Sequence, residues 1–344
     1  MLCYCTEFPL PYLLNKLSLQ QYKEAPFLWE IYFKKSPLYL IMNIAYVCYE
    51  DVGKYTSSVE NEDKILLEFL TGKGLDIKME VWTDPRVDWS VYDLAILKSP
   101  WDYFDKIRQF YNWLNQLEEL NVPLLNPIKV VKWNSDKHYL KEIADAGLSV
   151  VPTLYFEQGE KPDLTNCFEK LKSEKLIIKP CISGGSKNTL KITRENLAEL
   201  RPVIHEYLNE EAYITQPFLE EIETKGEWSF LFFNGKFSHS LLKKAKPGDF
   251  RVQHYLGGSI HAEAAPIHLL KSAEKYVQQF AKGCLYARVD GLEVKGQFML
   301  MELELIEPFL FLFTHQDSYE NYYIALAKMI DEMTIKGKTE LDLS

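Results

Sequence analysis

The sequence predicts a chain of mixed class, with an α/β region near the start and α+β regions after it. From Met42 to about residue 131, strand-like segments alternate with amphipathic helix-like segments. This alternation predicts a parallel sheet covered on both faces. Further on, strand pairs are joined at Asn234-Gly235 and near Lys295-Gly296, and such turns are strong hairpin signals. Consecutive hairpins predict an antiparallel sheet with one face available for a site.

The first unit, residues 42–131, is predicted to contain four strands and two helices. The helix over 58–74 begins near Ser57 or Ser58 and ends at Gly72 or Gly74, because these residue types favour helix termini. The helix over 103–120 places its apolar side chains on one face at helical spacing. The strands are the short apolar runs between these segments: 43–49, 77–82, 92–99 and 122–126.

Two further units follow. The second, residues 132–217, begins with a helix over 134–147 that is capped by Asn134 or Ser135 and stopped by Gly147. Its other elements alternate: strand 150–156, helix 167–175, strand 176–180, strand 189–193, helix 195–210 and strand 212–219. The third unit, residues 218–344, is predicted to hold the two hairpins, within 227–245 and 285–306, and helices over 267–283 and 318–333.

Composition excludes several classes of protein. Of 344 residues, 47% are hydrophobic and 26% are charged, and the formal net charge is −10. A negative chain argues against a nucleic-acid binder, whose affinity depends on a basic face. The six cysteines form no C-x-x-C motif, so neither a disulfide scaffold nor a zinc site is indicated. No run reaches the roughly 18 apolar residues of a membrane span. We expect no membrane partner and a reducing, cytoplasmic setting.

The residues before Met42 differ from the rest. Residues 1–41 are rich in aromatic residues and proline, and they lack the basic segment and apolar core of a signal peptide. "MNIAYVCYED" then reads as the first strand of an α/β unit. We expect residues 1–41 to be an extension outside the core fold that arises from an over-extended translation start.

The stretch "FMLMELELIEPFLFL", residues 298–312, places three glutamates in an apolar run. On a strand, alternate residues share a face, so Glu302 and Glu304 point one way while Met301, Leu303 and Leu305 point into the core. If the strand pairs with "ARVDG", Asp290 faces both glutamates. Three converging carboxylates suit Mg²⁺, which prefers oxygen ligands. The alternative is that Glu302 and Glu304 face solvent on an amphipathic strand.

A second group of residues follows the strand "LIIKP", which ends at Lys179. The turn "CISGGSKN" comes next, and its backbone N–H groups suit phosphate binding. Neither a Walker A loop nor G-x-G-x-x-G is present. Taken alone, the Gly-Gly turn is equally read as an ordinary turn, and Lys137 in "NSDKHYL" as a solvated helix lysine. His239 and Cys181 are read more simply as packed residues.

The order of these segments resembles the ATP-grasp superfamily, in its glutathione synthetase-like branch. That branch includes prokaryotic glutathione synthetase, RimK-type ligases and the cycloserine-forming cyclo-ligase. "FSHSLLKKAKPGDFRVQHYLGG" is the most distinctive match, and the resemblance covers about residues 42–330. It implies an ATP-grasp fold preceded by a Rossmann-like pre-ATP-grasp domain, with a small lid subdomain at 132–217 and the Mg²⁺ site in the C-terminal subdomain at 218–344.

The resemblance also implies roles for particular residues. Arg251 and Arg288 would steady the γ-phosphate and acyl-phosphate oxygens. Asp290, Glu302 and Glu304 would ligate two Mg²⁺ ions, with Mn²⁺ as a substitute. The ATP-binding residues would be Lys137 and Lys179 on the phosphates, a lid loop of Ser183, Gly184, Gly185 and Ser186, an adenine-binding strand of Gln216, Pro217, Phe218 and Leu219, and Glu227 near the ribose.

Three positions depart from the pattern of that branch. Glu304 stands where most relatives have Asn, which keeps an oxygen ligand and adds charge. Lys244 stands where many close relatives carry Arg, which weakens any bidentate phosphate contact there. Phe309 stands where a small polar residue is more usual, which leaves the nearby substrate contacts open.

The function implied is that of an ATP-dependent carboxylate–amine ligase, or cyclo-ligase, acting on an amino-acid-like small molecule. Phosphorylation by ATP would convert a carboxylate into an acyl phosphate, and an amine would displace phosphate. Such chemistry relies on positioning and charge neutralisation and needs no protein nucleophile. The alternatives are a non-catalytic ATP-binding or assembly protein and a phosphotransferase with a non-carboxylate acceptor. The acceptor pocket is expected near residues 99–103 and 254–261. The substrate identity and a homodimer remain open.

Overall fold

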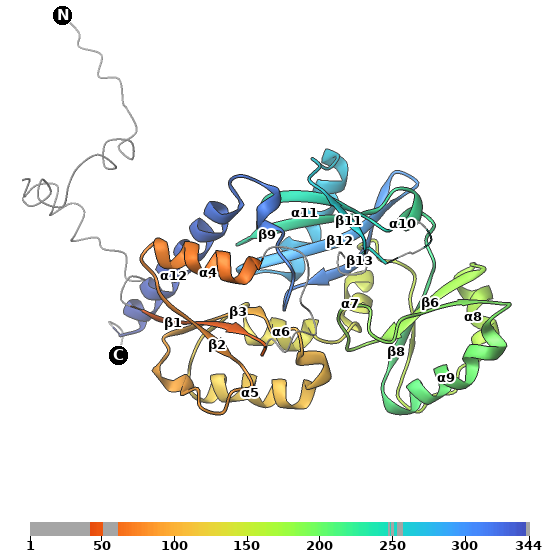
Figure 1. Cartoon of the computed structure of the whole chain (residues 1–344), viewed down its shortest axis with the longest axis horizontal. Helices are drawn as coiled ribbons and strands as arrows, with labels where there is room; N and C mark the ends of the chain where they lie inside the picture. The colour runs from red at the N-terminus through yellow and green to blue at the C-terminus, as the bar shows by residue number, and fades with distance from the viewer. Residues whose placement is uncertain (1–41, 51–60, 247, 249–250, 253–256, 342–344) are drawn as a thin grey trace, which may run out of the picture.

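The computed structural model describes residues 42–50, 61–246, 248, 251–252 and 257–341 (Figure 1). Three sheets organise these residues, and each sheet falls within one of the predicted units. The proposed N-terminal extension and the helix cap at Ser57 or Ser58 lie outside the described residues. Among the helices that are described, none is long and apolar enough to cross a membrane.

The first sheet is parallel, with strand order β2-β1-β3-β4. Its strands are β1 (Asn43–Cys48), β2 (Asp76–Val81), β3 (Leu94–Ser99) and β4 (Leu124–Leu125). Two helices, α4 (Glu62–Gly72) and α5 (Ile107–Glu119), accompany it. The strand order reverses at β1, because β2 lies on one side of it and β3 on the other. Ligands of open parallel sheets bind at such a point, outside the carboxyl ends of the strands. The residues that follow β3 are therefore placed to line a site, and the 3₁₀ turn Tyr103–Asp105 lies there.

The second sheet is antiparallel, with order β5-β8-β6-β7. Its strands are β5 (Leu154–Phe156), β6 (Lys175–Pro180), β7 (Leu190–Thr193) and β8 (Tyr213–Pro217). Helices α8 (Leu164–Leu171) and α9 (Leu197–Glu210) share one apolar core with it. Lys179 occupies the last position but one of β6.

The third sheet has the order β11-β10-β9-β12-β13. Its strands are β9 (Glu227–Phe233), β10 (Lys236–Lys244), β11 (Ser259–His261), β12 (Tyr286–Val294) and β13 (Gln297–Glu304). Both predicted hairpin turns are confirmed. Asn234 and Gly235 have φ values of 45° and 73°, and Lys295 and Gly296 have 51° and 78°, as two-residue hairpin turns require. Three helices lie in this part of the chain: α10 (Glu221–Thr224), α11 (Ile267–Phe280) and α12 (Ser318–Leu341).

Neither Asn134 nor Ser135 caps the start of a helix, so that prediction was wrong. The segment forms two short helices, α6 (Ile128–Asn134) and α7 (Tyr139–Asp145). The Asn134 side chain instead donates to the Leu303 carbonyl at 2.8 Å and accepts from Leu305 N–H at 2.9 Å. Because β13 is an edge strand, its outer backbone groups need partners, and this amide supplies them. The asparagine thereby fixes the strand that carries Glu302 and Glu304.

A buried ion pair of the first unit holds the segment that follows β13. Lys98 of β3 is fully buried and lies 3.1 Å from the Glu62 carboxylate. Glu62 also accepts hydrogen bonds from the backbone N–H groups of Leu310 (2.8 Å) and Leu312 (2.9 Å). One apolar core runs through both regions, from Ile44 to Ile330. The segment after β13 is therefore held against the first sheet.

His239 is packed, and its environment predicts a pH effect on stability. Its Nε2 lies 2.9 Å from the Leu310 carbonyl, and burial lowers the pKa of the imidazole to about 4. The unfolded chain takes up this proton near pH 6.5 and the folded chain only near pH 4. The free energy of unfolding should therefore fall by about 3 kcal/mol as the pH drops through this window.

The test compares urea unfolding of wild type, His239→Gln and His268→Gln at several pH values between 7.5 and 4. His268 is exposed and serves as the control. His239→Gln should flatten the decline in stability between pH 6.5 and 4, while His268→Gln should leave it unchanged. Equal slopes in all three proteins would contradict the assignment.

Candidate active site

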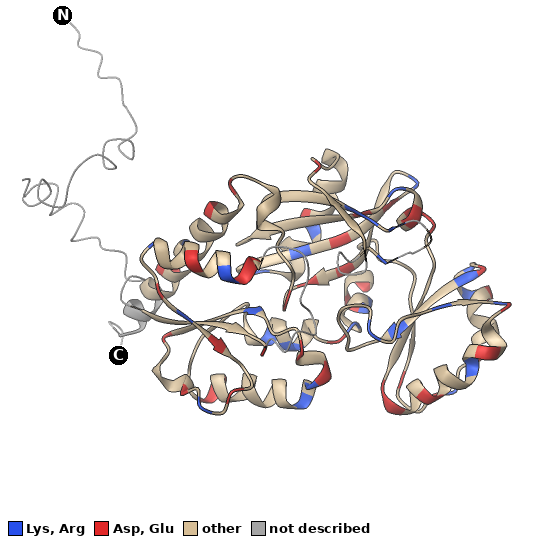
Figure 2. Cartoon of the chain, viewed as in Figure 1, with Lys and Arg blue, Asp and Glu red and all other residues tan. Residues whose placement is uncertain are grey.

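The predicted carboxylate cluster forms on β12 and β13. Asp290 pairs with Glu302, and Arg288 pairs with Glu304, so the three acids and one base share a face. The expectation for Met301 was wrong, because a bulge between Asp290 and Gly291 removes it from the ladder. Met301 lines the cavity instead, whereas Leu303 and Leu305 are buried as expected. Acidic and basic segments lie side by side on the central strands in Figure 2.

Arg288 contacts two of the three acids, Asp290 and Glu304. Its guanidinium bonds Asp290 through Nε (3.1 Å) and Nη2 (2.9 Å), and Nη2 also contacts the Glu304 carboxylate. Its Nη1 donates to the Phe309 carbonyl at 2.9 Å. Burial alone would raise the pKa of Asp290, but Arg288 and Lys243 lower it to about 2. Burial raises the pKa of Glu304 to about 8 despite the guanidinium, with repulsion from Asp290 and Glu302 adding to the effect.

Lys243 is a site residue that the sequence analysis missed. Its Nζ lies 3.0 Å from Asp290 Oδ2 and contacts the Glu227 carboxylate. Its side chain is 8% exposed, whereas that of Lys244, one of the three positions that depart from the branch pattern, is exposed. Burial raises the pKa of Glu227 in spite of this lysine. The available signal was its place in the segment "FSHSLLKKAKPGDFRVQHYLGG", but which of the two adjacent lysines points inward depends on strand register.

Two lysines approach the acids from the second sheet and its neighbourhood. Lys137 lies 3.4 Å from Glu302 and donates to the Ser183 carbonyl at 2.8 Å. Lys179 Nζ has no hydrogen bond or ion pair with any residue that the structure describes, and burial lowers its pKa. A desolvated, unpaired ammonium beside Glu302 is suited to receive an anionic ligand.

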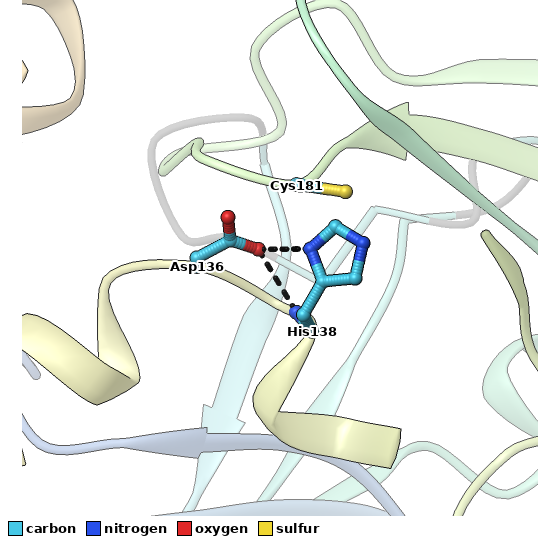
Figure 3. A group of neighbouring side chains, drawn as sticks. All are labelled: Asp136, His138 and Cys181. Carbon is cyan, nitrogen blue, oxygen red and sulfur yellow. Dashed lines mark hydrogen bonds and ion pairs between the residues drawn. The ribbon is translucent and has the colours of Figure 1, made fainter. Parts of the chain in front are cut away.

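Asp136 and His138 flank Lys137, and with Cys181 they form a compact group (Figure 3). Asp136 Oδ1 accepts from His138 N–H at 2.9 Å and lies 2.6 Å from His138 Nδ1. Lys137 N–H donates to the Cys181 carbonyl at 2.9 Å. Cys181 is 1% exposed, and burial raises the pKa of its thiol, as expected for a packed cysteine. We interpret the group as a support that fixes the backbone at Lys137.

The glycine-rich turn, which contains Ser183–Ser186, contacts the first unit. A Cβ on Gly184 would stand 2.5 Å from Phe104 Cε1, so only glycine fits there without displacing the ring. Lys187 Nζ lies 2.5 Å from Asp105 Oδ1. The turn residues Gly185 and Ser186 have φ values of 58° and 60°. The turn therefore lies against the 3₁₀ turn Tyr103–Asp105, across the cavity from β12 and β13.

One cavity of about 330 Å³ brings the predicted residues together. Every residue predicted to bind nucleotide, metal or acyl phosphate lines it, including Gln216–Leu219 on one wall and Arg251 on another. Trp101 and Tyr103 from the expected acceptor segment 99–103 and Ile260 from the segment 254–261 also line it, and residues 253–256 lie outside the described residues. The sequence analysis gave no site role to three further lining residues, Lys243, Phe104 and Glu307.

The charges of the cavity fit a nucleotide with divalent cations. The described lining holds five acids and five bases. A nearly balanced lining suits a ligand of low net charge, such as a nucleoside triphosphate neutralised by divalent cations. The unpaired Lys179 fits a phosphate, and the oxygen-only set of Asp290, Glu302 and Glu304 fits Mg²⁺.

The chain is similar in sequence and in structure to known proteins. A family model for the N-terminal domain of D-cycloserine synthetase DcsG matches residues 44–126. The cycloserine biosynthesis protein DcsG of Streptomyces lavendulae is 27% identical over 285 residues, which cover 77% of this chain and 92% of that protein. The crystal structure of D-cycloserine synthetase DcsG matches with a TM-score of 0.71 at 24% identity, covering 83% of this chain and 99% of that chain.

A further solved structure shows the fold with ligands. The ATP-grasp ligase PsnB, complexed with a precursor variant, Mg and ADP, matches with a TM-score of 0.59 at 15% identity and covers 84% of this chain and 99% of that one. The predicted ATP-grasp fold is therefore confirmed. The chain is therefore similar in sequence to a cycloserine biosynthesis protein and shares the fold of ATP-grasp ligases, and both findings support an enzyme that forms bonds with the use of ATP.

Proposed function

We propose that this chain is an ATP-dependent ligase that joins a carboxylate to an amine, between two molecules or within one, through an acyl phosphate. The observation that carries the proposal is the convergence of Asp290, Glu302 and Glu304 with Lys179 in one cavity. Similarity to a cycloserine biosynthesis protein supports an amino-acid-like substrate.

The proposed roles are those that the resemblance implies, and the convergence of the side chains in one cavity supports them. Asp290, Glu302 and Glu304 would hold one or two Mg²⁺ ions, which neutralise phosphate charge when bound. Lys137 and Lys179 would bind the α- and β-phosphates. Arg251 and Arg288 would bind the transferred phosphoryl group. Charged side chains that already stand in position in a partly desolvated cavity stabilise the transition state without having to reorganise during the reaction.

The Gln216–Leu219 segment is suited to bind a nucleobase edge. Phe218 N–H donates to the Lys175 carbonyl at 2.8 Å. Because backbone groups alternate in direction along an extended segment, Leu219 N–H and the Pro217 carbonyl point away from β6. Leu219 N–H has no hydrogen bond to a described residue. One donor and one acceptor then face the cavity, as an adenine edge requires. Glu227 near the ribose remains part of the proposal, although its carboxylate contacts Lys243.

In the first step a substrate carboxylate oxygen attacks the γ-phosphorus, and ADP leaves. In the second step an amine nitrogen attacks the acyl carbon, phosphate leaves, and the nitrogen loses a proton. The protein holds the reacting groups in line and excludes water, which is the main catalytic contribution expected in phosphoryl transfer.

The test measures ADP release with D- and L-amino acids, with and without hydroxylamine. An acyl phosphate is trapped by hydroxylamine as a hydroxamate, so the proposal predicts Mg²⁺-dependent ADP and hydroxamate in equal amounts. A stable phosphorylated product would favour the phosphotransferase alternative. Nucleotide binding without turnover for any acceptor would favour the non-catalytic alternative.

The glycine-rich turn yields a further prediction. Gly184→Val places a branched side chain against Phe104 and should push the turn away from the first unit, raising the KM for ATP roughly five- to hundredfold. Phe104→Leu in the same chain should recover part of the loss, because it returns space to the turn. Steady-state kinetics of both single variants and the double variant check this. An unchanged KM in Gly184→Val would contradict a lid role for the turn.

A further inference from the structure

Glu307 is the third glutamate of the apolar stretch 298–312, and no role assigned so far uses it. It is partly buried, and its side chain lines the cavity. Among the described residues, its carboxylate has no hydrogen bond or ion pair. The other four acids of the lining differ, because Glu227, Asp290, Glu302 and Glu304 each have a basic partner.

The position of Glu307 is fixed from both sides. Its backbone carbonyl accepts from Trp101 Nε1 at 3.0 Å, so the residue lies against the carboxyl end of β3. Three residues further on, Leu310 N–H is held by Glu62. The Glu307 side chain therefore lines the cavity where the first unit meets the segment after β13.

The surroundings of Glu307 lack a compensating charge within bonding distance. Burial raises its pKa well above the usual range, and the nearby Glu304 and Glu302 raise it further. A desolvated carboxylate beside like charges costs several kcal/mol unless a cation joins it. Trp101, Tyr103 and Phe309 line the same cavity, and Trp101 contacts the Glu307 backbone. A carboxylate among aromatic side chains is suited to recognise an ammonium group.

We propose that Glu307, with Trp101 and Tyr103, forms a subsite for a primary ammonium group of the substrate. This inference rests on the proposed ligase function and specifies its substrate class: a molecule that carries a positively charged amine as well as the reacting carboxylate. The ammonium is held as a binding group, so it adds equally to the binding of ground state and transition state. Removing its partner should then raise KM with little change in kcat.

The experiment uses the full-length chain with amino acids and their deamino counterparts, such as alanine with propionate and serine with 3-hydroxypropionate. Wild type should release ADP with one or more amino acids and not with the matching deamino acids. Glu307→Gln should raise the KM for the amino acid at least tenfold with kcat within about threefold, because it removes the charge of a buried ion-pair partner. Glu293→Gln, at an exposed ion pair on β12, is the matched control and should behave as wild type.

Isothermal titration of MgATP into wild type and Glu307→Gln separates the outcomes. Equal affinities show that the variant is folded and that Glu307 lies outside the nucleotide site. Failure of wild type to bind MgATP would contradict the proposed function itself. With MgATP binding intact, the subsite is overturned by turnover with deamino acids, by the absence of a response to any amine, or by a loss in kcat at unchanged KM.

Discussion

Glu302→Gln is expected to lower Mg²⁺-dependent ADP release by about 10²–10³-fold, the range measured when one preorganised electrostatic group is removed from an active site. Glu302 faces Asp290 across the ladder and lies 3.4 Å from Lys137. Burial opposes its ionisation, yet Lys137 and Lys179 lower its pKa, so it is an anion ready to bind a cation. Glutamine keeps the shape and removes the charge.

The measurement is kcat for ADP release over a range of Mg²⁺ concentrations. Glu293→Gln on the neighbouring strand is again the control, because its partner Lys225 is half-exposed. Turnover of Glu302→Gln within tenfold of wild type at saturating Mg²⁺ would show that Glu302 does not ligate the metal.

Arg288→Met is expected to lower the free energy of unfolding by about 3–5 kcal/mol, because it leaves buried carboxylates without their partner. Arg288 is 8% exposed and contacts both Asp290 and Glu304. Turnover should also be lost, since the same guanidinium is placed for the phosphoryl group. Methionine retains much of the volume, so the loss comes from charge rather than from a cavity.

Arg194→Met provides the comparison for stability. Arg194 is 40% exposed and pairs with Glu169 and Glu174 at the surface, where removal should cost less than about 1 kcal/mol. Urea unfolding of the two variants at pH 7 checks the difference. A loss at Arg288 no larger than that at Arg194 would mean that the buried acids are neutral in the folded chain.

Local patterns in the sequence predicted most of the structure near the metal site. The alternation of β12 and β13 predicted that Glu302, Glu304 and Asp290 share a face, because side chains alternate along a strand. The hairpin turns were readable because Asn-Gly and Lys-Gly adopt positive φ. The ATP-grasp fold was predicted because the order of motifs resembles that superfamily, and the comparisons confirm the fold.

Features that depend on strand irregularity or distant contacts were not predictable. Met301 left the core because of a bulge that no local signal marks. A register shift between Phe237 and His239 lies upstream of Lys243 on β10, so simple alternation could not show which lysine points inward. The sequence predicts Asn134 as a helix cap, yet its side chain bonds the backbone of Leu303 on β13, 169 residues away in the sequence. Glu307 was visible in the sequence, but its contact with Trp101 spans 206 residues.

The proposed catalysis depends on metal ions held between a nucleotide and the acids of β12 and β13. The most direct test is a crystal grown with ADP and Mn²⁺, with the metal located by its anomalous scattering. The prediction is that Mn²⁺ is bound by Asp290, Glu302 and Glu304 and also by the diphosphate, with Lys179 on a phosphate oxygen. Nucleotide in the cavity with no metal at these carboxylates, or Mn²⁺ found instead at Asp136, His138 and Cys181, would contradict it.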